Sequence, residues 1–334
     1  MTPATGTDAA PGAAPGADLA ARALACWDLP VGAAARPLNV AENLTYLVTA
    51  PGLRRVLRLH RPGYHDARAI ESEVTWIGAL RTDGRVAVPH PRRGRDGAFV
   101  QAVPEAAGQL ATLFDFHPGT APDADGDLVP GFEALGAIAA ACHAHAAEWP
   151  RPAGFVRPAW DLEAVFGPAA PWGDWRAAPH LSPDDLRLLD RAQRAVSDRI
   201  DAYGMGPDRH GLIHADMRLA NLLVADGAIR LIDFDDCGFG WLLYDFAAAV
   251  SFIETDPRLP DLKAAWLRGY GVHRAPPPEA DEMADAFVML RRFALLAWIA
   301  SRADAPEPRA MAPHFAAGTV ALATRWLRAG SLTA

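Results

Sequence analysis

The fold of this chain is decided by one stretch, residues 210–247, which reads HGLIHADMRLANLLVADGAIRLIDFDDCGFGWLLYDFA. Two short apolar segments lie inside it, at residues 222–224 and 229–232, and Asp226-Gly227 stands between them. An Asp-Gly pair between apolar segments is a strong signal for a tight β-turn, because both turn positions need positive φ angles. The stretch therefore predicts a β-hairpin whose open end lies at residues 221 and 233.

The two residues at that open end are Asn221 and Asp233. Mg²⁺ is a hard cation that takes a few protein oxygens and completes its coordination with water and phosphate oxygens. Asp216 stands on the loop that follows the apolar segment 211–213, where it could accept the proton of a substrate hydroxyl. The stretch thus predicts a metal site of Asn221 and Asp233, with Asp216 as a catalytic base.

Length and charge narrow the classes of function. The chain has 334 residues, of which 51% are hydrophobic. Since domains typically contain about 100 to 200 residues, this length accommodates two lobes with separate cores. The net charge of −8 argues against a general binder of nucleic acid or of anionic membranes, because those partners require clustered Lys and Arg. A cationic substrate would match this charge better.

The cysteines are Cys26, Cys142 and Cys237, without a C-x-x-C pair, so we expect reduced thiols and neither a zinc site nor a disulfide framework. His143 and His145 stand beside Cys142, but the apolar periodicity there favours a packed helix over a metal site. The N-terminus lacks a basic segment before an apolar one, and no run of about 18 apolar residues occurs. We expect a cytoplasmic protein without a membrane partner.

The order of patterns along the chain predicts an α+β fold with two lobes. Residues 1–18 are read as a disordered tail, 19–112 as an N-terminal lobe with an antiparallel sheet and a helix, and 113–334 as a larger, mainly helical lobe. In the first lobe we expect a hairpin at 37–59 around Pro51-Gly52, a helix at 67–80 and a strand pair within 87–103. Residues 110–119 are read as the crossover, and helical periodicity follows at 135–142, 186–200 and 283–300.

One charged residue in the first lobe needs a partner. Glu73 falls in the apolar stripe of the predicted helix, which contains Ile70, Val74 and Ile77. A carboxylate on a buried face is costly unless a cation meets it. Arg58 on the preceding strand is the candidate, and the alternative is that Glu73 reaches solvent.

His214, Asp216 and Asn221, followed by Asp233, resemble the catalytic loop and metal loop of kinases. From about residue 39 to the C-terminal helices, the sequence looks like the aminoglycoside phosphotransferase and choline kinase-like family. The resemblance implies a protein kinase-like fold, with ATP and Mg²⁺ as cofactors. It also implies that Asp216 is the base, that Asn221 and Asp233 bind the metal, and that His214 braces the loop.

The resemblance extends to nucleotide contacts. It implies that Arg58 touches the α- and β-phosphates and pairs with Glu73, although Arg55 is an alternative to Arg58. No glycine-rich loop precedes Arg58, so Asn43 and Thr45 are candidates for phosphate contacts, with a structural turn as the alternative. Adenine would be bound by the segment that contains Leu113, Phe114 and Phe116, with a buried strand as the alternative. Asp245 would brace the catalytic loop from a helix start.

The acceptor would be selected by the second lobe. Aromatic and acidic residues there suit an amine-bearing or sugar-like molecule, and the alternative is that most of the tryptophans belong to the core. The candidates are Trp160, Asp235, Asp236, Trp241 and Glu254.

The leading hypothesis is an ATP- and Mg²⁺-dependent phosphotransferase that moves the γ-phosphate to a hydroxyl of a small amine-containing molecule. The resemblance implies an antibiotic, homoserine or an amino alcohol as acceptor, and, for an antibiotic acceptor, a role in antibiotic resistance. The alternatives are a bacterial Ser/Thr protein kinase of the same fold and a catalytically silent nucleotide-binding module. Ala215 stands where protein kinases carry the Arg that reads a phosphorylated activation loop, so we expect no such regulation. The oligomeric state and the choice between ATP and GTP stay open.

Overall fold

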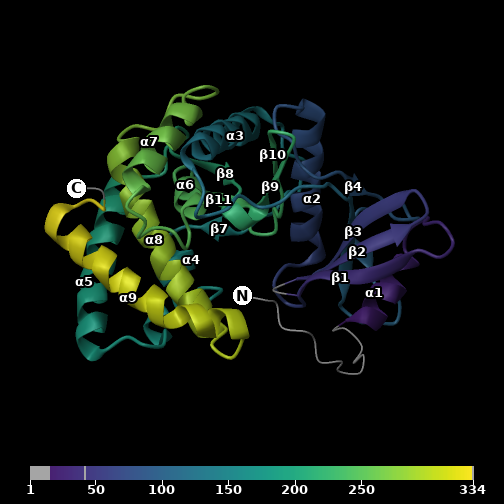
Figure 1. Cartoon of the computed structure of the whole chain (residues 1–334), viewed down its shortest axis with the longest axis horizontal. Coiled ribbons are helices and arrows are strands. Elements are labelled where there is room, and N and C mark those ends of the chain that lie inside the picture. The colour runs from purple at the N-terminus through teal and green to yellow at the C-terminus, as the bar shows by residue number, and fades with distance from the viewer. Residues whose placement is uncertain (1–15, 41–42, 333–334) are drawn as a thin grey trace, which may run out of the picture. The chain divides into compact units, whose positions relative to one another are not determined.

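The computed structural model describes residues 16–40 and 43–332 (Figure 1). Within them the chain divides into two compact units. Each unit consists of two segments of the chain. Unit 1 contains the first segment, up to Gly78, together with Pro89–His117. Unit 2 contains Ala79–Val88 together with the chain from Pro118 onward. Unit 1 contains an antiparallel sheet with helices, and unit 2 is mainly helical, so the predicted α+β, two-lobed fold is confirmed.

The sheet of unit 1 has the strand order β1-β2-β3-β6-β4, with β5 also paired to β6. Its strands are β1 (Ala34–Val40), β2 (Leu44–Ala50), β3 (Leu53–Leu59), β4 (Pro91–Arg92), β5 (Gln101–Ala102) and β6 (Leu110–Asp115). The predicted hairpin is confirmed, because Ala50 pairs with Leu53 across the Pro51-Gly52 turn. The prediction of a strand pair within 87–103 is wrong, because β4 and β5 each pair with β6 and not with each other. The backbone hydrogen bonds of both strands go to β6, which follows them in the chain.

Unit 1 extends beyond the predicted lobe at both ends. The helix α1 (Ala17–Leu24) begins inside the segment 1–18 that was expected to be disordered, and residues 1–15 lie outside the described residues. Its Ala20 and Ala23 pack into the core with Trp27 and Tyr46, because small side chains let this short helix lie close to the sheet. At the other end unit 1 runs to His117, since β6 belongs to its sheet. The helix α2 (Ala67–Asp83) confirms the predicted helix.

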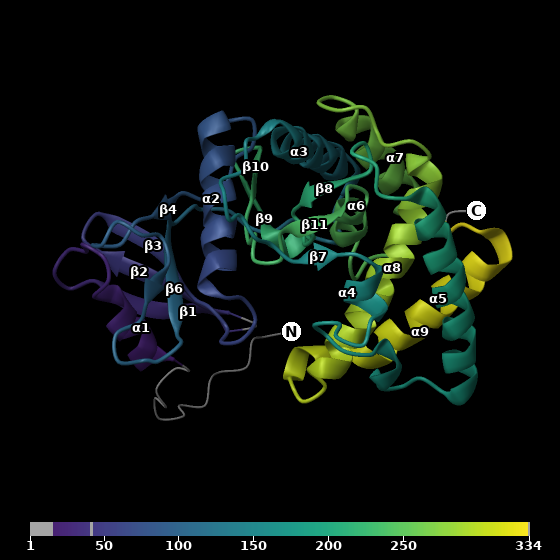
Figure 2. The same cartoon turned by 180° about the vertical axis from the view of Figure 1, so that it is seen from behind.

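Unit 2 combines helices with two small sheets (Figure 2). Its helices are α3 (Val129–Glu148), α4 (Leu162–Phe166), α5 (Pro183–Tyr203), α6 (Tyr244–Ala249), α7 (Leu259–Tyr270), α8 (Ala280–Ser301) and α9 (Pro306–Ala329), with 3-10 turns at Trp175–Ala177 and Leu219–Asn221. One sheet is the hairpin of β9 (Leu222–Ala225) and β10 (Ala228–Leu231), and the other has the order β7-β11-β8. The three predicted helical segments of this lobe lie in α3, α5 and α8.

The helix α8 runs through unit 2 and packs against α5, α6, α7 and α9. A helix that is apolar on all sides is typical of a core position, and α8 is buried along most of its length. Two adjacent arginines, Arg291 and Arg292, interrupt its apolar surface and are 2% and 3% exposed. In the described part of the chain, no helix is long and apolar enough to cross a membrane.

Two glycines let α3 and α7 approach each other closely. A Cβ atom added at Gly136 would lie 2.0 Å from the carbonyl oxygen of Trp266, and one added at Gly269 would lie 1.8 Å from that of Glu133. These distances are far below van der Waals contact. The backbones of α3 and α7 therefore touch at the two glycines, where no side chain separates them. The contact fixes where α3 lies, and α3 carries His143 into the centre of unit 2.

We predict that Gly136→Ala lowers the free energy of unfolding by about 3 kcal/mol, because a methyl group there must push two helix backbones apart. Gly131→Ala is the matched control, since Gly131 lies in the same helix with no atom within 4 Å of the added Cβ. The control should gain up to about 1 kcal/mol, because alanine favours the helix over glycine. Denaturant titration of both variants measures the difference, and equal stabilities would contradict the close helix approach.

Candidate active site

The hairpin of β9 and β10 is built as the sequence predicts. Leu222 pairs with Leu231, and the turn residues Asp226 and Gly227 have φ angles of 51° and 75°. Beyond the last strand pair, the backbone N–H of Ile232 donates to the carbonyl oxygen of Asn221 at 3.0 Å. Ile232 therefore faces Asn221, and Asp233 is the next residue in the chain. Asp233 is exposed and has a φ of 60°, whereas Asn221 is 5% exposed.

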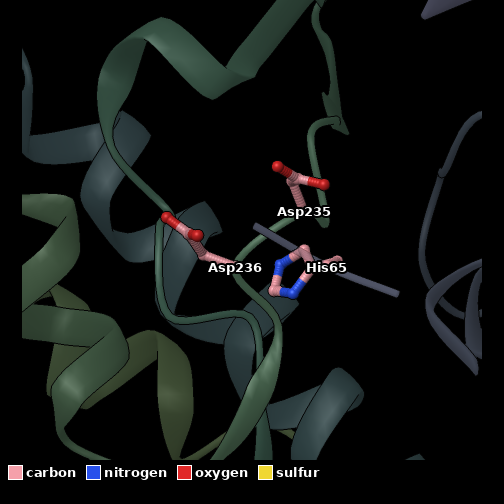
Figure 3. A group of neighbouring side chains, drawn as sticks. All are labelled: His65, Asp235 and Asp236. Atoms are coloured by element: carbon pink, nitrogen blue, oxygen red, sulfur yellow. The ribbon is translucent and has the colours of Figure 1, made fainter. Parts of the chain in front are cut away.

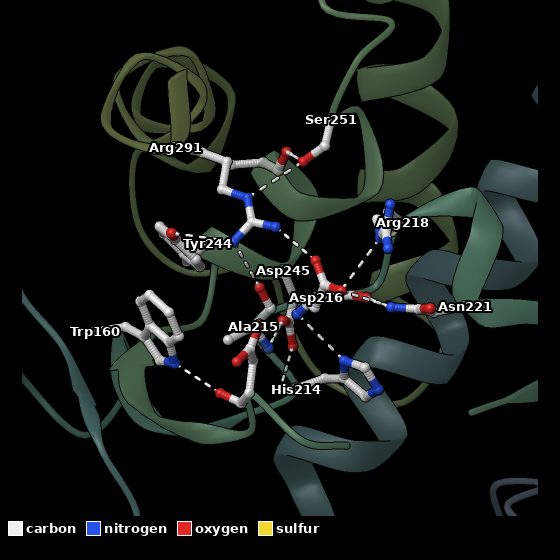
Figure 4. Close-up of polar contacts among 12 residues, drawn as sticks. Trp160, His214, Ala215, Asp216, Arg218, Asn221, Tyr244, Asp245, Ser251 and Arg291 are labelled. Carbon is white, nitrogen blue, oxygen red and sulfur yellow. Dashed lines mark hydrogen bonds and ion pairs between the residues drawn. The ribbon is translucent and has the colours of Figure 1, made fainter. Parts of the chain in front are cut away.

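Asp216 lies on the loop between β8 (His210–Ile213) and the turn that ends at Asn221. The side-chain amide nitrogen of Asn221 donates to Oδ2 of Asp216 at 2.6 Å and to its carbonyl oxygen at 2.9 Å. With the nitrogen engaged in this way, Asn221 has only its amide oxygen to offer a metal. The arrangement brings the side chain of Asn221 and the carboxylate of Asp216 together on one loop (Figure 4).

Two arginines flank the Asp216 carboxylate. Nη2 of Arg291 lies 2.5 Å from Oδ1, and Nε of Arg218 lies 3.3 Å from Oδ2. Burial alone would raise the pKa of Asp216, but the charges of Arg218 and Arg291 and the hydrogen bond from Asn221 lower it below its usual value. Asp216 is therefore an ionised carboxylate, which is the form that can accept a proton.

His214 links this loop to the hairpin. Its Nδ1 accepts the backbone N–H of Asp216 at 3.2 Å, so its Nε2 carries the hydrogen and donates to the carbonyl oxygen of Ile232 at 3.1 Å. Burial lowers the pKa of His214, which keeps the imidazole in this neutral form. The ring also packs on Phe234, with 4.5 Å between ring centroids. This geometry is that of the brace expected from the sequence.

Asp245 holds the loop from the start of α6. Its Oδ1 accepts the backbone N–H of Ala215 at 2.6 Å, and its Oδ2 accepts that of His214 at 3.1 Å and Nε2 of His143 at 2.9 Å. Nδ1 of His143 in turn bonds to the hydroxyl of Tyr270 at 2.9 Å. The structure thus gives Asp245 the structural position expected of it, and His143 supports it instead of binding a metal.

The unit 1 candidates centre on β3. Arg58 and Glu73 form an ion pair in which the two side chains are 8% and 0% exposed, so the predicted partner of Glu73 is confirmed. Arg55 pairs instead with Asp115 at 3.1 Å. Thr45 lies opposite Arg58 in the register of β2 and β3. Arg58 is thus the basic residue that faces the helix glutamate, as the family pattern requires.

The remaining unit 1 candidates lie at the start of β2 and in or just after β6. Oδ1 of Asn43 accepts the backbone N–H of Arg61 at 2.9 Å, which ties the start of β2 to the chain that follows β3. Leu113 and Phe114 lie inside β6 with paired strands on both sides, so they are interior strand residues. Phe116 follows the strand, and its ring stacks under the Arg54 guanidinium at 3.6 Å.

The acceptor candidates of unit 2 fall into two groups. Asp235 and Asp236 lie on the segment after β10 (Figure 3), and the indole N–H of Trp160 donates to the carbonyl oxygen of Asp236 at 2.7 Å. Trp241 and Glu254, in contrast, are buried and already engaged, so the prediction that they touch substrate is corrected. The indole of Trp241 bonds to the carbonyl oxygen of Gly204, and Glu254 pairs with Arg292 at 3.0 Å.

Sequence reasoning missed two arginines. Arg218 stands two residues after Asp216 within the decisive stretch, and its charge at that place was a usable signal. Arg291 interrupts an apolar helix, which is the same signal that identified Glu73 as a residue in need of a partner. Its partner lies 75 residues earlier in the chain, a distance over which no local pattern connects the two.

Comparison with known proteins identifies the family. The model of the phosphotransferase enzyme family APH matches residues 34–285. The chain belongs to this family. The APH chain is therefore an ATP-dependent kinase that acts on a small molecule with a hydroxyl group, as the leading hypothesis predicted. This result supports the leading hypothesis over the protein kinase and the silent module.

Individual relatives agree with this assignment. A solved structure of a microcompartment-associated aminopropanol kinase is 44% identical, with a TM-score of 0.87, and covers 94% of this APH chain and 98% of that chain. Amicoumacin kinase of Bacillus subtilis (strain 168) is 24% identical over 71% of this chain and 69% of its own length. The solved structure of amicoumacin kinase hAmiN shares the fold, with a TM-score of 0.74. It is 20% identical and covers 91% of this chain and 92% of that chain.

We predict that Glu73→Gln lowers the free energy of unfolding by about 3 kcal/mol, because it removes the negative charge against which the buried guanidinium of Arg58 is held. Glu71→Gln is the matched control, since this half-buried residue lies on the same helix, and its effect should stay within about 0.5 kcal/mol. Denaturant titration compares the two variants. Losses of equal size would contradict the ion pair.

Proposed function

We propose that this chain transfers the γ-phosphate of ATP to the hydroxyl of a small amino alcohol of the aminopropanol class, with Mg²⁺ as the metal. The observation that carries the acceptor class is the likeness to an aminopropanol kinase, at 44% identity over 94% of this chain. The ionised Asp216 beside Asn221 supports the reaction, because phosphoryl transfer to an alcohol needs a base near the attacking oxygen.

In the proposed reaction the acceptor oxygen attacks the γ-phosphorus. The bond from that phosphorus to the ADP oxygen breaks, and the hydroxyl proton passes to the carboxylate of Asp216. Such proton transfer contributes about 10²- to 10⁴-fold to a rate, so most of the catalysis must come from positioning and charge. Arg218 lies beside Asp216 with its side chain 36% exposed, and its charge suits the oxygens of a transferring phosphoryl group.

Asn221 and Asp233 would hold the metal. Their donors are an amide oxygen and a carboxylate, an all-oxygen set of the kind that Mg²⁺ prefers. Asn221 is fixed by its bonds to Asp216, and Asp233 stands at the exposed end of the hairpin, where phosphate and water oxygens could complete the set. When bound, Mg²⁺ neutralises negative charge on the phosphates.

Unit 1 would supply the nucleotide contacts. Arg58, ion-paired to Glu73, presents a planar guanidinium that suits the α- and β-phosphates. Asn43 and Thr45 are proposed to lie near the phosphates, and Leu113, Phe114 and Phe116 near the adenine. The support for these roles is their arrangement around β3 and β6 together with the family pattern.

The ammonium group of the acceptor would meet a carboxylate that lies beside a buried aromatic cluster near Asp216. Trp160 packs on Tyr244 and on Trp172, with 5.9 and 5.2 Å between ring centroids. Burial raises the pKa of Tyr244, and the nearby charge of Asp236 adds to this rise. The rings are buried, but Asp236 is half-buried, and a carboxylate forms charge-assisted hydrogen bonds with an alkylammonium ion. We therefore propose Asp236 as its counter-ion.

The acceptor class is tested by measuring ATP consumption, with and without Mg²⁺, on aminopropanol, ethanolamine, choline, homoserine, amicoumacin, an aminoglycoside and a generic protein. We expect Mg²⁺-dependent turnover with the small amino alcohols and the highest kcat/KM with aminopropanol. A clear preference for an antibiotic or for the protein would overturn the proposed acceptor.

Asp236→Asn tests whether the negative charge of Asp236 recognises the ammonium group of the acceptor. It should lower kcat/KM for aminopropanol by about 10- to 100-fold, as expected for a hydrogen bond to a charged group, and leave the uncharged 1,2-propanediol unaffected. Asp261→Asn removes the same charge from an exposed site on α7 and should change neither substrate. Equal losses on both substrates would argue against an ammonium site at Asp236.

The roles of Asp216 and Asp233 are separated by comparing turnover with nucleotide binding. We expect Asp216→Asn to lower kcat by about 10²- to 10⁴-fold while Mg·ATP still binds, because the base acts only on the proton. Asp233→Asn should weaken nucleotide binding in Mg²⁺ but not in EDTA. A turnover assay measures kcat, and calorimetric titration with a non-hydrolysable ATP analogue measures the nucleotide affinity of both variants. Unchanged affinity of Asp233→Asn in Mg²⁺ would exclude the metal role.

A further inference from the structure

Arg291 gathers three separate segments around one guanidinium (Figure 4). Its Nη2 donates to Oδ1 of Asp216 at 2.5 Å, and its Nη1 donates to the carbonyl oxygen of Ala215 at 3.3 Å and to the hydroxyl of Tyr244 at 3.4 Å. Its Nε donates to the hydroxyl of Ser251 at 3.3 Å. The catalytic loop, the start of α6 and the chain just after α6 are thus tied to α8.

The packing of α8 does not by itself call for a cation at this place. Arg291 is 2% exposed, and a buried ion pair is often no more stabilising than well-packed apolar side chains of similar volume. Among the described residues, Asp216 is the carboxylate with which Arg291 forms an ion pair. The buried charge is therefore better explained by what it does to Asp216 than by the packing of the helix.

The residue before Asp216, Ala215, is held on both sides of its backbone. Ala215 has a φ of 64°, a left-handed conformation that costs a non-glycine residue about 1 to 3 kcal/mol unless its surroundings fix it. Asp245 accepts the N–H of Ala215, and Arg291 donates to its carbonyl oxygen. Without Arg291, Ala215 would lose the contact at its carbonyl oxygen and keep the one at its N–H.

The carboxylate of Asp216 is also held at both oxygens. Oδ1 faces Arg291, and Oδ2 accepts from Asn221 and lies near Arg218. Contacts at both ends fix the rotation of the carboxylate plane, and Arg291 supplies the contact at Oδ1. A base that is misplaced by about 1 Å can lose about 10²-fold in rate.

We propose that Arg291 is a positioning residue for phosphoryl transfer, which aims the carboxylate of Asp216 at the acceptor hydroxyl. The proposal rests on the proposed function, in which Asp216 is the base. Arg292, the next residue, offers a matched comparison. It is equally buried, but it contacts Glu254, Thr319 and the carbonyl oxygen of Phe315.

The test measures kcat and the KM of ATP and of aminopropanol for Arg291→Met and Arg291→Lys, each with and without Asp216→Asn. We expect Arg291→Met to lower kcat by about 100-fold with both KM values within about threefold, since Arg291 acts through the base. Arg291→Lys should recover part of the loss. In the Asp216→Asn background, Arg291→Met should change kcat by less than about threefold, because coupled residues are not additive.

Arg292→Lys is the control for a general effect on folding. It should keep kcat near the wild-type value when assayed well below its unfolding temperature. Equal losses from Arg291→Met in both backgrounds would overturn the proposal, and so would a rise in the KM of aminopropanol with unchanged kcat. Full turnover by Asp216→Asn alone would instead refute the proposed base.

Discussion

Asp245 lies at the start of α6 with 0% exposure, and its two oxygens accept three N–H groups, from His214, Ala215 and His143. A buried carboxylate is tolerated only where hydrogen bonds satisfy it. Here two of the three bonds come from the loop that carries Asp216, so satisfying Asp245 also shapes that loop. The left-handed Ala215 is the visible result, because its N–H must turn toward α6.

The helices of unit 2 complete this arrangement from a distance. The α3–α7 contact through Gly136 and Gly269 lets α3 bring His143 to Asp245, and Tyr270 at the end of α7 orients the same imidazole. On another side, α8 contributes Arg291. The chemistry is therefore placed by a few buried polar contacts between long helices, and a loop without such contacts would not hold its carboxylate in one orientation.

Local patterns predicted the parts of the site that are close in sequence. The Asp226-Gly227 turn fixes the hairpin that brings Asn221 and Asp233 to one end, and the stripe around Glu73 pointed to Arg58. Longer-range pairing was not readable, since the strands β4 and β5 each join β6, and Arg291 lies far from Asp216 in the chain. Sequence also cannot tell a tryptophan that lines a site from one that packs in the core, and Trp241 proved to be the second kind.

The adjacent arginines of α8 carry a consequence for how this protein can evolve. Successive residues of an α-helix point about 100° apart, so Arg291 and Arg292 meet different partners, Asp216 on one side and Glu254 on the other. Loss or gain of a single residue earlier in α8 would turn both guanidiniums away from their carboxylates together. A change in the length of α8 before Arg291 would therefore disturb both ion pairs at once, whereas a substitution at Arg291 or Arg292 would remove only one of them.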